Sequence, residues 1–305
     1  MTTGSVIFRL DISHAVIDAV SRSILFHEWS LIYTDQLPDQ VAPSYCNYVR
    51  HLLNTSDSAT RYWVEYLQDS QPCLFPVSAT PGNERGSLKN IVISVDDTPD
   101  LHSICQKHGF TIPTLVKSVW ALMLSSWMDK SSVYFGYLDS GRHTPIPDIQ
   151  ETVGALLNIL ICRARLDEHA SLSNILETMQ EDYYQSLSHS SGTLRALKML
   201  GLTPPSQHIF NTLINYRKTG LSSTPEQTGL VFDSISAEDK MEFDAVLQVD
   251  EIGKELGLSI DYWDARIPET VARQIAGLFK IIWTRLLEDP SQQVLVVQQA
   301  MRTMV

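Results

Sequence analysis

A histidine and an aspartate four residues apart, His14 and Asp18, stand close to the start of the chain. An alternating apolar run over residues 5–12 precedes them and is typical of a strand, whereas the stretch over residues 15–33 has the periodicity of a helix. Neutral imidazole is the usual proton acceptor near pH 7. At a strand-to-helix turn, the imidazole would point outward from a rigid frame. The carboxylate of Asp18 would pair with a cation across the site.

Charge and composition narrow the classes of function. The 305 residues carry a net charge of −12 without any Lys/Arg-rich run, so we expect no nucleic-acid partner. The N-terminus has no basic-then-apolar signal pattern, and no apolar stretch approaches the ~18 residues of a membrane span. We therefore expect a cytoplasmic protein that does not contact membranes.

Cysteine spacing argues against a metal site and against a disulfide framework. The four cysteines show no Cys-x-x-Cys pair, and we expect reduced thiols: Cys46, Cys73, Cys105 and Cys162.

A metal bound by His14 and Asp18 would lack its third ligand. Ser140 is not in a Gly-x-Ser-x-Gly pattern, which argues against a serine hydrolase. His189 is expected in a surface loop. No metal and no tightly bound cofactor is predicted.

Strand and helix patterns intermingle without a regular β-α-β alternation, which predicts an α+β fold with mixed sheets and flanking helices. Later helices are expected over 45–53, 59–67, 99–108, 114–128, 172–187, 192–200 and 268–287, and strands over 89–95, 133–138, 153–166, 210–216, 240–248 and 256–263. A Pro/Gly/Ser-rich stretch suggests a linker at residues 71–90. It would separate a domain over residues 1–70 from one over residues 91–305.

Five separated sequence motifs carry a family resemblance. They are Ser13-His14-Ala15-Val16-Ile17-Asp18, Phe135-Gly136-x-x-x-Ser140-Gly141-Arg142, Ile146-Pro147-x-Ile149-x-x-x-Val153-Gly154-x-x-x-Asn158, Phe210-Asn211-Thr212 with Tyr216, and Leu258-Ser259-x-Asp261-Tyr262. In this order they resemble the condensation domains of nonribosomal peptide synthetases, most of all the terminal condensation-type domains of fungal synthetases. Ala19 stands where the family's His word has Gly.

The resemblance implies a chloramphenicol acetyltransferase-like fold, in which two α+β lobes enclose a tunnel. Thioesters on the phosphopantetheine arms of carrier proteins would enter the tunnel from opposite faces. His14 would lie inside it, accepting a proton from the nucleophile or positioning that nucleophile. Asp18 would play a structural part by pairing with Arg142. Ser13, Ser140 and Asn158 are candidates for lining the tunnel.

The position of the motif that contains His14 departs from the family pattern. In the family it comes about a third of the way into the domain, whereas here it begins at residue 13. The resemblance therefore implies a complete C-terminal lobe over residues 91–305 and only the end of the N-terminal lobe over residues 1–70. A sheet edge beside residues 6–12 would then be unpaired, and we expect either a homodimer that covers it or a poorly soluble monomer.

Two functions remain open from the sequence. The first is a stand-alone or truncated condensation-type acyltransferase or cyclase of fungal secondary metabolism. It would form an amide or ester, or close a ring, on a carrier-bound or released peptide. The alternative is a non-catalytic or repurposed binding module that docks a carrier protein or guides the cyclisation of a small molecule.

Overall fold

The computed structural model describes residues 7–54, 56–75, 85–95, 100–202, 209–219, 230–233 and 241–302. The chain forms two compact units. The first unit takes in residues 1–54, 140–157 and 223–240, and the second takes in residues 55–139, 158–222 and 241–305.

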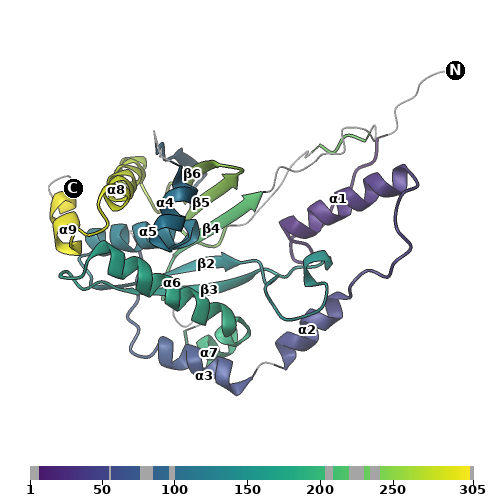
Figure 1. Cartoon of the computed structure of the whole chain (residues 1–305), viewed down its shortest axis with the longest axis horizontal. Helices are drawn as coiled ribbons and strands as arrows, with labels where there is room; N and C mark the ends of the chain where they lie inside the picture. Colours follow the sequence, from purple (N-terminus) through teal and green to yellow (C-terminus); the bar gives the residue numbers. More distant parts are fainter. Residues whose placement is uncertain are drawn as a thin grey trace. The chain divides into compact units, whose positions relative to one another are not determined.

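A mixed six-stranded sheet forms the centre of the second unit, with the order β1-β6-β5-β4-β2-β3 (Figure 1). Strand β4 runs parallel to both β2 and β5, and the other neighbours are antiparallel. The predicted α+β class is therefore confirmed. The strands are β1 (Leu88–Val92), β2 (Ser132–Asp139), β3 (Asn158–Arg165), β4 (Thr212–Thr219), β5 (Ala245–Ile252) and β6 (Glu255–Trp263).

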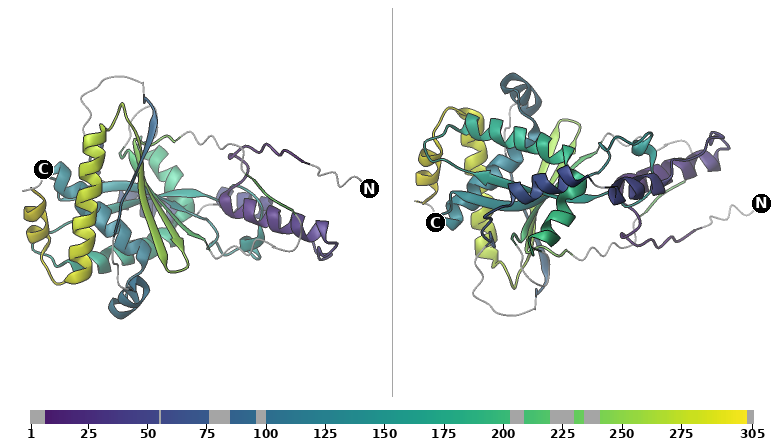
Figure 2. Two further views of the ribbon diagram at one scale, coloured as in Figure 1. Left: turned by 90° about the horizontal axis from the view of Figure 1, so that it is seen from above. Right: turned by 90° about the horizontal axis from the view of Figure 1, so that it is seen from below.

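Helices α6, α5 and α8 lie side by side over one face of this sheet (Figures 1 and 2). Thr111 caps α5 by accepting a hydrogen bond from the backbone N–H of Thr114 at 3.3 Å, and Pro113 occupies the first turn, where a missing N–H costs nothing. The helices of this unit are α3 (Asp57–Tyr66), α4 (Leu101–His108), α5 (Ile112–Met128), α6 (Leu172–Ser188), α7 (Thr193–Met199), α8 (Glu269–Glu288) and α9 (Val294–Arg302).

The two faces of the sheet differ in chemistry. The helix-covered face belongs to one large apolar core that includes Trp63, Trp120, Phe135 and Trp283. Along the other face, polar side chains link neighbouring strands through hydrogen bonds of 2.7–2.9 Å, in the order Asn215, Gln248, Asp261 and Asn90. At β5 and β6 the core thus fills one side of the sheet, while hydrogen bonds tie the strands together on the other. At β2 both faces are buried, since the neighbouring residues Tyr134 and Phe135 both belong to the core.

A side chain covers part of the sheet edge at β3. The hydroxyl of Tyr66, from α3, accepts a hydrogen bond from the backbone N–H of Arg163 at 2.9 Å and donates to its carbonyl at 3.4 Å. The Arg163 guanidinium donates to the Tyr66 carbonyl at 2.8 Å. The helix therefore supplies the hydrogen bonds that a neighbouring strand would otherwise make.

The first unit contains α1 (Ala19–Tyr33), α2 (Tyr45–Leu53) and the connection between β2 and β3, with its 3₁₀ turn η1 (Ile149–Glu151). Its buried apolar cluster is small and consists of Tyr48, Ile149 and Leu156. Phe232 stacks on Phe26 of α1, with ring centroids 4.4 Å apart.

The strand predicted over residues 5–12 is wrong for the part that the structure describes. Residues 7–12 form no strand, and Ile7 and Phe8 are 89% and 91% exposed. No described strand lies beside them, and an isolated strand is not stable in water. The helix also starts later than predicted, at Ala19, because the side chain of Asp18 caps it.

The compact units do not follow the predicted boundary at residues 71–90. Helix α3, expected with residues 1–70, places Trp63 in the core of the second unit. Residues 140–157, expected within 91–305, belong to the first unit. Within the predicted linker, residues 76–84 lie outside the described residues. Strand β3 begins at Asn158 rather than at residue 153, and helix α9 was not expected.

Candidate functional site

Asp18 and Arg142 form an ion pair in the first unit, and both are almost fully buried, with 3% and 4% exposure. The Nη2 of Arg142 lies 3.1 Å and 3.3 Å from the two carboxylate oxygens. The carboxylate also accepts the backbone N–H of Ser21 at 2.7 Å and that of Leu156 at 3.3 Å. Asp18 thus joins the start of α1 to a segment more than a hundred residues later in the chain.

The guanidinium of Arg142 also holds its own loop together. Its Nη1 donates to the carbonyls of Ile149 at 3.0 Å and Gln150 at 2.9 Å, and the Gln150 amide donates back to the Arg142 carbonyl at 2.7 Å. Its Nε–H has no partner among the described residues. A lysine presents one point charge and cannot reproduce this fork of donors.

Ser21 connects the same two segments through its hydroxyl. Its Oγ accepts from Arg142 Nη2 at 3.1 Å and from the backbone N–H of Gly154 at 3.0 Å, and donates to the carbonyl of Gly154 at 2.8 Å. We call Asp18, Ser21, Arg142 and Gly154 the polar staple. It fixes the start of α1 against the loop over residues 140–157.

Glycine at position 154 is required by close packing. A Cβ built there would lie 2.2 Å from Cδ2 of Tyr45, inside van der Waals contact. The hydroxyl of Tyr45 donates to the carbonyl of Ala155 at 2.9 Å, and that of Tyr48 donates to Leu156 at 3.0 Å. Helix α2 therefore presses on the loop beside the polar staple.

His14 is exposed and lies in a turn four residues before Asp18. The turn is closed by the backbone N–H of Val16, which donates to the carbonyl of Ser13 at 3.1 Å, while the Ser13 hydroxyl accepts from the N–H of Ala15 at 3.3 Å. The imidazole makes no hydrogen bond within the described residues. The polar staple, rather than the expected strand, therefore supports the turn of His14. The location of His14 in a tunnel stays a prediction.

The remaining predicted site residues are divided between the units. The hydroxyl of Ser140 accepts from the backbone N–H of Arg142 at 3.3 Å, at the entrance to the loop of the polar staple. Asn158 belongs to the second unit, where its amide donates to the carbonyl of Ser190 at 2.9 Å. Ser21 was missed because a serine in the first turn of a helix carries no signal for a distant backbone partner.

The second unit contains a buried amine that no predicted site includes. Nζ of Lys117, on α5, lies 3.3 Å from the ring centroid of Tyr183 and 4.6 Å from that of Tyr137. Burial lowers the pKa of Lys117 to about 7, against a smaller opposing effect of Cys162 and Asp139. This amine is therefore partly uncharged at neutral pH.

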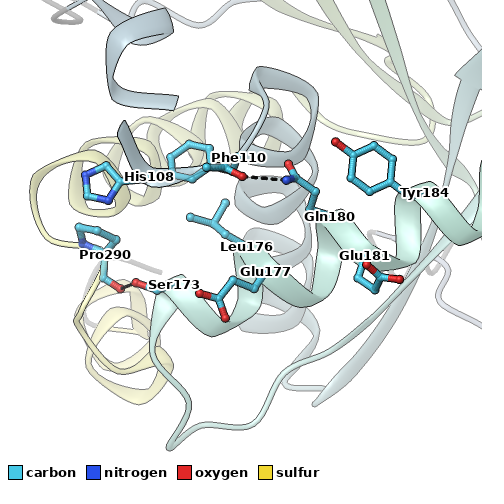
Figure 3. Close-up of a pocket in the computed structure, with 10 residues that line it drawn as sticks. His108, Phe110, Ser173, Leu176, Glu177, Gln180, Glu181, Tyr184 and Pro290 are labelled. Carbon is cyan, nitrogen blue, oxygen red and sulfur yellow. Dashed lines mark hydrogen bonds between the residues drawn. The ribbon is translucent and has the colours of Figure 1, made fainter. Parts of the chain in front are cut away.

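A cavity of about 300 Å³ lies beside α6 in the second unit (Figure 3). Its lining includes His108, Phe110, Leu176 and Glu177, and the amide of Gln180 donates across it to the carbonyl of Gly109 at 2.8 Å. None of the predicted site residues lines this cavity.

The described residues contain no cluster of three or more His, Cys, Asp or Glu side chains that could hold a metal ion. In the same residues, no helix is both long and apolar enough to cross a membrane. All four cysteines are free thiols, with Cys46 exposed and the other three buried.

Curated proteins that are similar to the chain include fungal nonribosomal peptide synthetases. It is 33% identical over 312 residues to the nonribosomal peptide synthetase ungA of Aspergillus violaceofuscus, with 99% of this chain and 3% of that protein covered. It is 30% identical over 297 residues to nonribosomal peptide synthetase 1 of Aspergillus fumigatus, with 96% and 5% covered. The chain thus spans a small part of these relatives.

Solved structures show the same fold at lower identity. A crystal structure of a protein called CT superposes with a TM-score of 0.70 at 22% identity, over 93% of this chain and 64% of that one. The condensation domain of the monacolin K polyketide synthase MokA superposes with a TM-score of 0.72 at 16% identity, over 92% and 69%. The predicted chloramphenicol acetyltransferase-like fold is confirmed by these neighbours.

The family model of the condensation domain matches residues 1–300. The match runs through the His14 turn, both halves of the polar staple and every strand of the sheet. The chain belongs to the condensation-domain family.

Proposed function

We propose that the chain acts in acyl transfer as a condensation-type enzyme of fungal secondary metabolism, forming an amide or ester bond or closing a ring. The acyl donor is a peptidyl thioester, presented on the phosphopantetheine arm of a carrier protein. The observation that carries the proposal is the buried pair of Asp18 and Arg142 behind the exposed turn of His14. This ion pair fixes the backbone near His14 and makes no hydrogen bond to the imidazole.

The chemistry needs little more than placement and one proton acceptor. An amine or hydroxyl attacks the thioester carbonyl while the imidazole of His14 accepts the proton of this nucleophile or holds the nucleophile in position. The tetrahedral intermediate then collapses, the C–S bond breaks, and the thiol leaves with a proton. Holding two reactants together is worth about 7–11 kcal/mol, and a positioned acid or base adds about 10²–10⁴-fold.

A paired substitution tests the role of His14. His14→Ala should lower product formation at least about 10²-fold, because the proton acceptor is lost. His27→Ala is the matched control, since His27 is another exposed histidine on α1 of the same unit. The probes are peptidyl N-acetylcysteamine thioesters with a free amine or hydroxyl, and amide, ester or cyclic products are measured by mass spectrometry. Equal turnover of the two variants and wild type would remove His14 from the mechanism.

One observation favours a second function, that of a binding module. The exposed imidazole of His14 has no hydrogen-bond partner in the described part of the chain, and a catalytic imidazole is usually oriented by one. A phosphopantetheine-bearing carrier protein would then bind the wild type and His14→Ala with equal affinity, and neither would give product. Isothermal titration with the same carrier protein separates this case from the enzyme.

A further inference from the structure

We propose that Ser21 is a positioning residue for the proposed reaction: its hydroxyl holds the turn of His14 in a working orientation by locking α1 onto Gly154. This inference rests on the proposed function. None of the sequence motifs assigned Ser21 a role, and its side chain does not need to touch substrate.

The hydroxyl of Ser21 uses its full hydrogen-bonding capacity. A serine hydroxyl offers one donor and two acceptor positions. Here the donor goes to the carbonyl of Gly154 at 2.8 Å, and the acceptor positions receive the N–H of Gly154 at 3.0 Å and Nη2 of Arg142 at 3.1 Å. The residue is fully buried, so water cannot replace any of these partners.

The backbone of Ser21 adds a fourth contact that reaches the turn. Its N–H donates to the carboxylate of Asp18 at 2.7 Å, which fixes the first turn of α1. His14 precedes Asp18 by four residues, and no described strand supports the segment in front of it. The orientation of this turn therefore depends on how firmly α1 is held at Gly154.

Removing the hydroxyl has a predictable consequence. In Ser21→Ala, both backbone groups of Gly154 lose their partner in a buried place, and unsatisfied buried polar groups are costly. The loop over residues 152–157 is expected to shift or open, and His14 shifts with α1. Misplacement of about 1 Å can cost about 10²-fold in rate.

The experiment compares three variants of the full chain. Ser21→Ala removes the hydroxyl and Ser21→Thr keeps it. Ser23→Ala is the matched control, because the Ser23 hydroxyl is exposed and its hydrogen bond, to the carbonyl of Ala19 at 3.2 Å, lies within its own helix. Two properties are measured: kcat and KM with the thioester probes, and hydrogen–deuterium exchange of peptides covering residues 13–21 and 152–157.

Ser21→Ala should lower kcat about 10- to 100-fold with KM unchanged, and should speed exchange in both peptides. Ser21→Thr should recover most of kcat, and Ser23→Ala should match wild type. If exchange in Ser21→Ala equals that of wild type, or if kcat falls only in proportion to the unfolded fraction, the inference is overturned. Absence of product from wild type would instead contradict the proposed function, and the exchange data would still decide whether Ser21 locks the turn.

Discussion

In the second unit the largest buried side chains are apolar, such as Trp120 on α5, whereas in the first unit they include the charged pair Asp18 and Arg142. Among its described residues the first unit has a buried apolar cluster of three residues, and hydrogen bonds join α1 to the loop over residues 140–157. Apolar burial is additive and tolerant of exchange, while a buried polar network depends on every member.

This difference teaches where the molecule is sensitive to single changes. Losing one partner of a buried ion pair leaves a charge without compensation, which costs more than the pair itself contributes. Hydrophobic residues of similar volume can often replace one another in a large core. The segment that carries His14 is thus the part most easily disturbed by one substitution, while the sheet of the second unit is robust.

The largest effect is expected from Arg142→Ala. Because Asp18 would be left buried and unpaired, the first unit should lose about 3–5 kcal/mol of stability, and Arg142→Lys should recover only part of it. Hydrogen–deuterium exchange should rise in peptides from residues 13–33 and 140–157 and stay unchanged in α5. Arg9→Ala, at an exposed arginine of the same unit, is the control. Equal loss of protection in α5 would contradict the comparison.

A smaller effect is expected from adding one methyl group to each unit. Gly154→Ala places a Cβ 2.2 Å from Tyr45 and should destabilise the first unit by about 1–3 kcal/mol. Gly277→Ala, inside α8, meets nothing within 4 Å and should stabilise the second unit by about 1 kcal/mol. Both changes in stability are measured by urea unfolding, with hydrogen–deuterium exchange as the readout for each unit. A harmless Gly154→Ala would show that the loop is not tightly packed.

A third prediction concerns Lys117, a charged group that is buried in the second unit. Its folded pKa of about 7 lies below the ordinary value of 10.5. Between these values the unfolded chain binds a proton that the folded chain does not, so stability falls as pH is lowered from 9 to 7, by about 2 kcal/mol. Below about pH 6 the amine is protonated in both states, and this contribution no longer changes.

Replacing the amine isolates this dependence on pH. Lys117→Met should remove the difference in urea midpoint between pH 7 and pH 9 and should raise stability at pH 7. Lys130→Met is the control, because its ammonium group lies near the surface and donates to the carbonyl of Pro72 at 2.9 Å. A wild-type midpoint that is the same at pH 7 and pH 9 would show that the amine is not desolvated.

Local patterns predicted most helices and strands, because caps and periodicity are encoded within each segment. The boundaries of α2 match the prediction at Tyr45 and Leu53, and the strand predicted over 256–263 is present as β6 (Glu255–Trp263). The motif resemblance paired Asp18 with Arg142, and the two are in contact in the structure. Whether His14 is catalytic is a prediction that awaits the experiments above.

Long-range contacts account for what the sequence did not show. Alternation over residues 5–12 indicates a strand only if a neighbouring strand exists. The side chain of Trp63 donates to the carbonyl of His189 at 2.8 Å, a contact that places α3 with the second unit and that no local pattern contains. Likewise, the partners of Ser21 are backbone groups of Gly154. Such groups occur in nearly every residue, so the sequence does not identify them as partners.

The hydroxyl of Tyr66 has a consequence for how the protein behaves at high concentration. Exposed strand edges recruit strands from other molecules and so promote aggregation. At β3 an incoming strand would first have to displace a phenol that already satisfies both backbone groups of Arg163. The opposite edge, β1, has no such cover among the described residues but carries Lys89, whose charge opposes stacking of like chains. The Tyr66 hydroxyl therefore disfavours self-association at the β3 edge, and the charge of Lys89 disfavours it at the β1 edge.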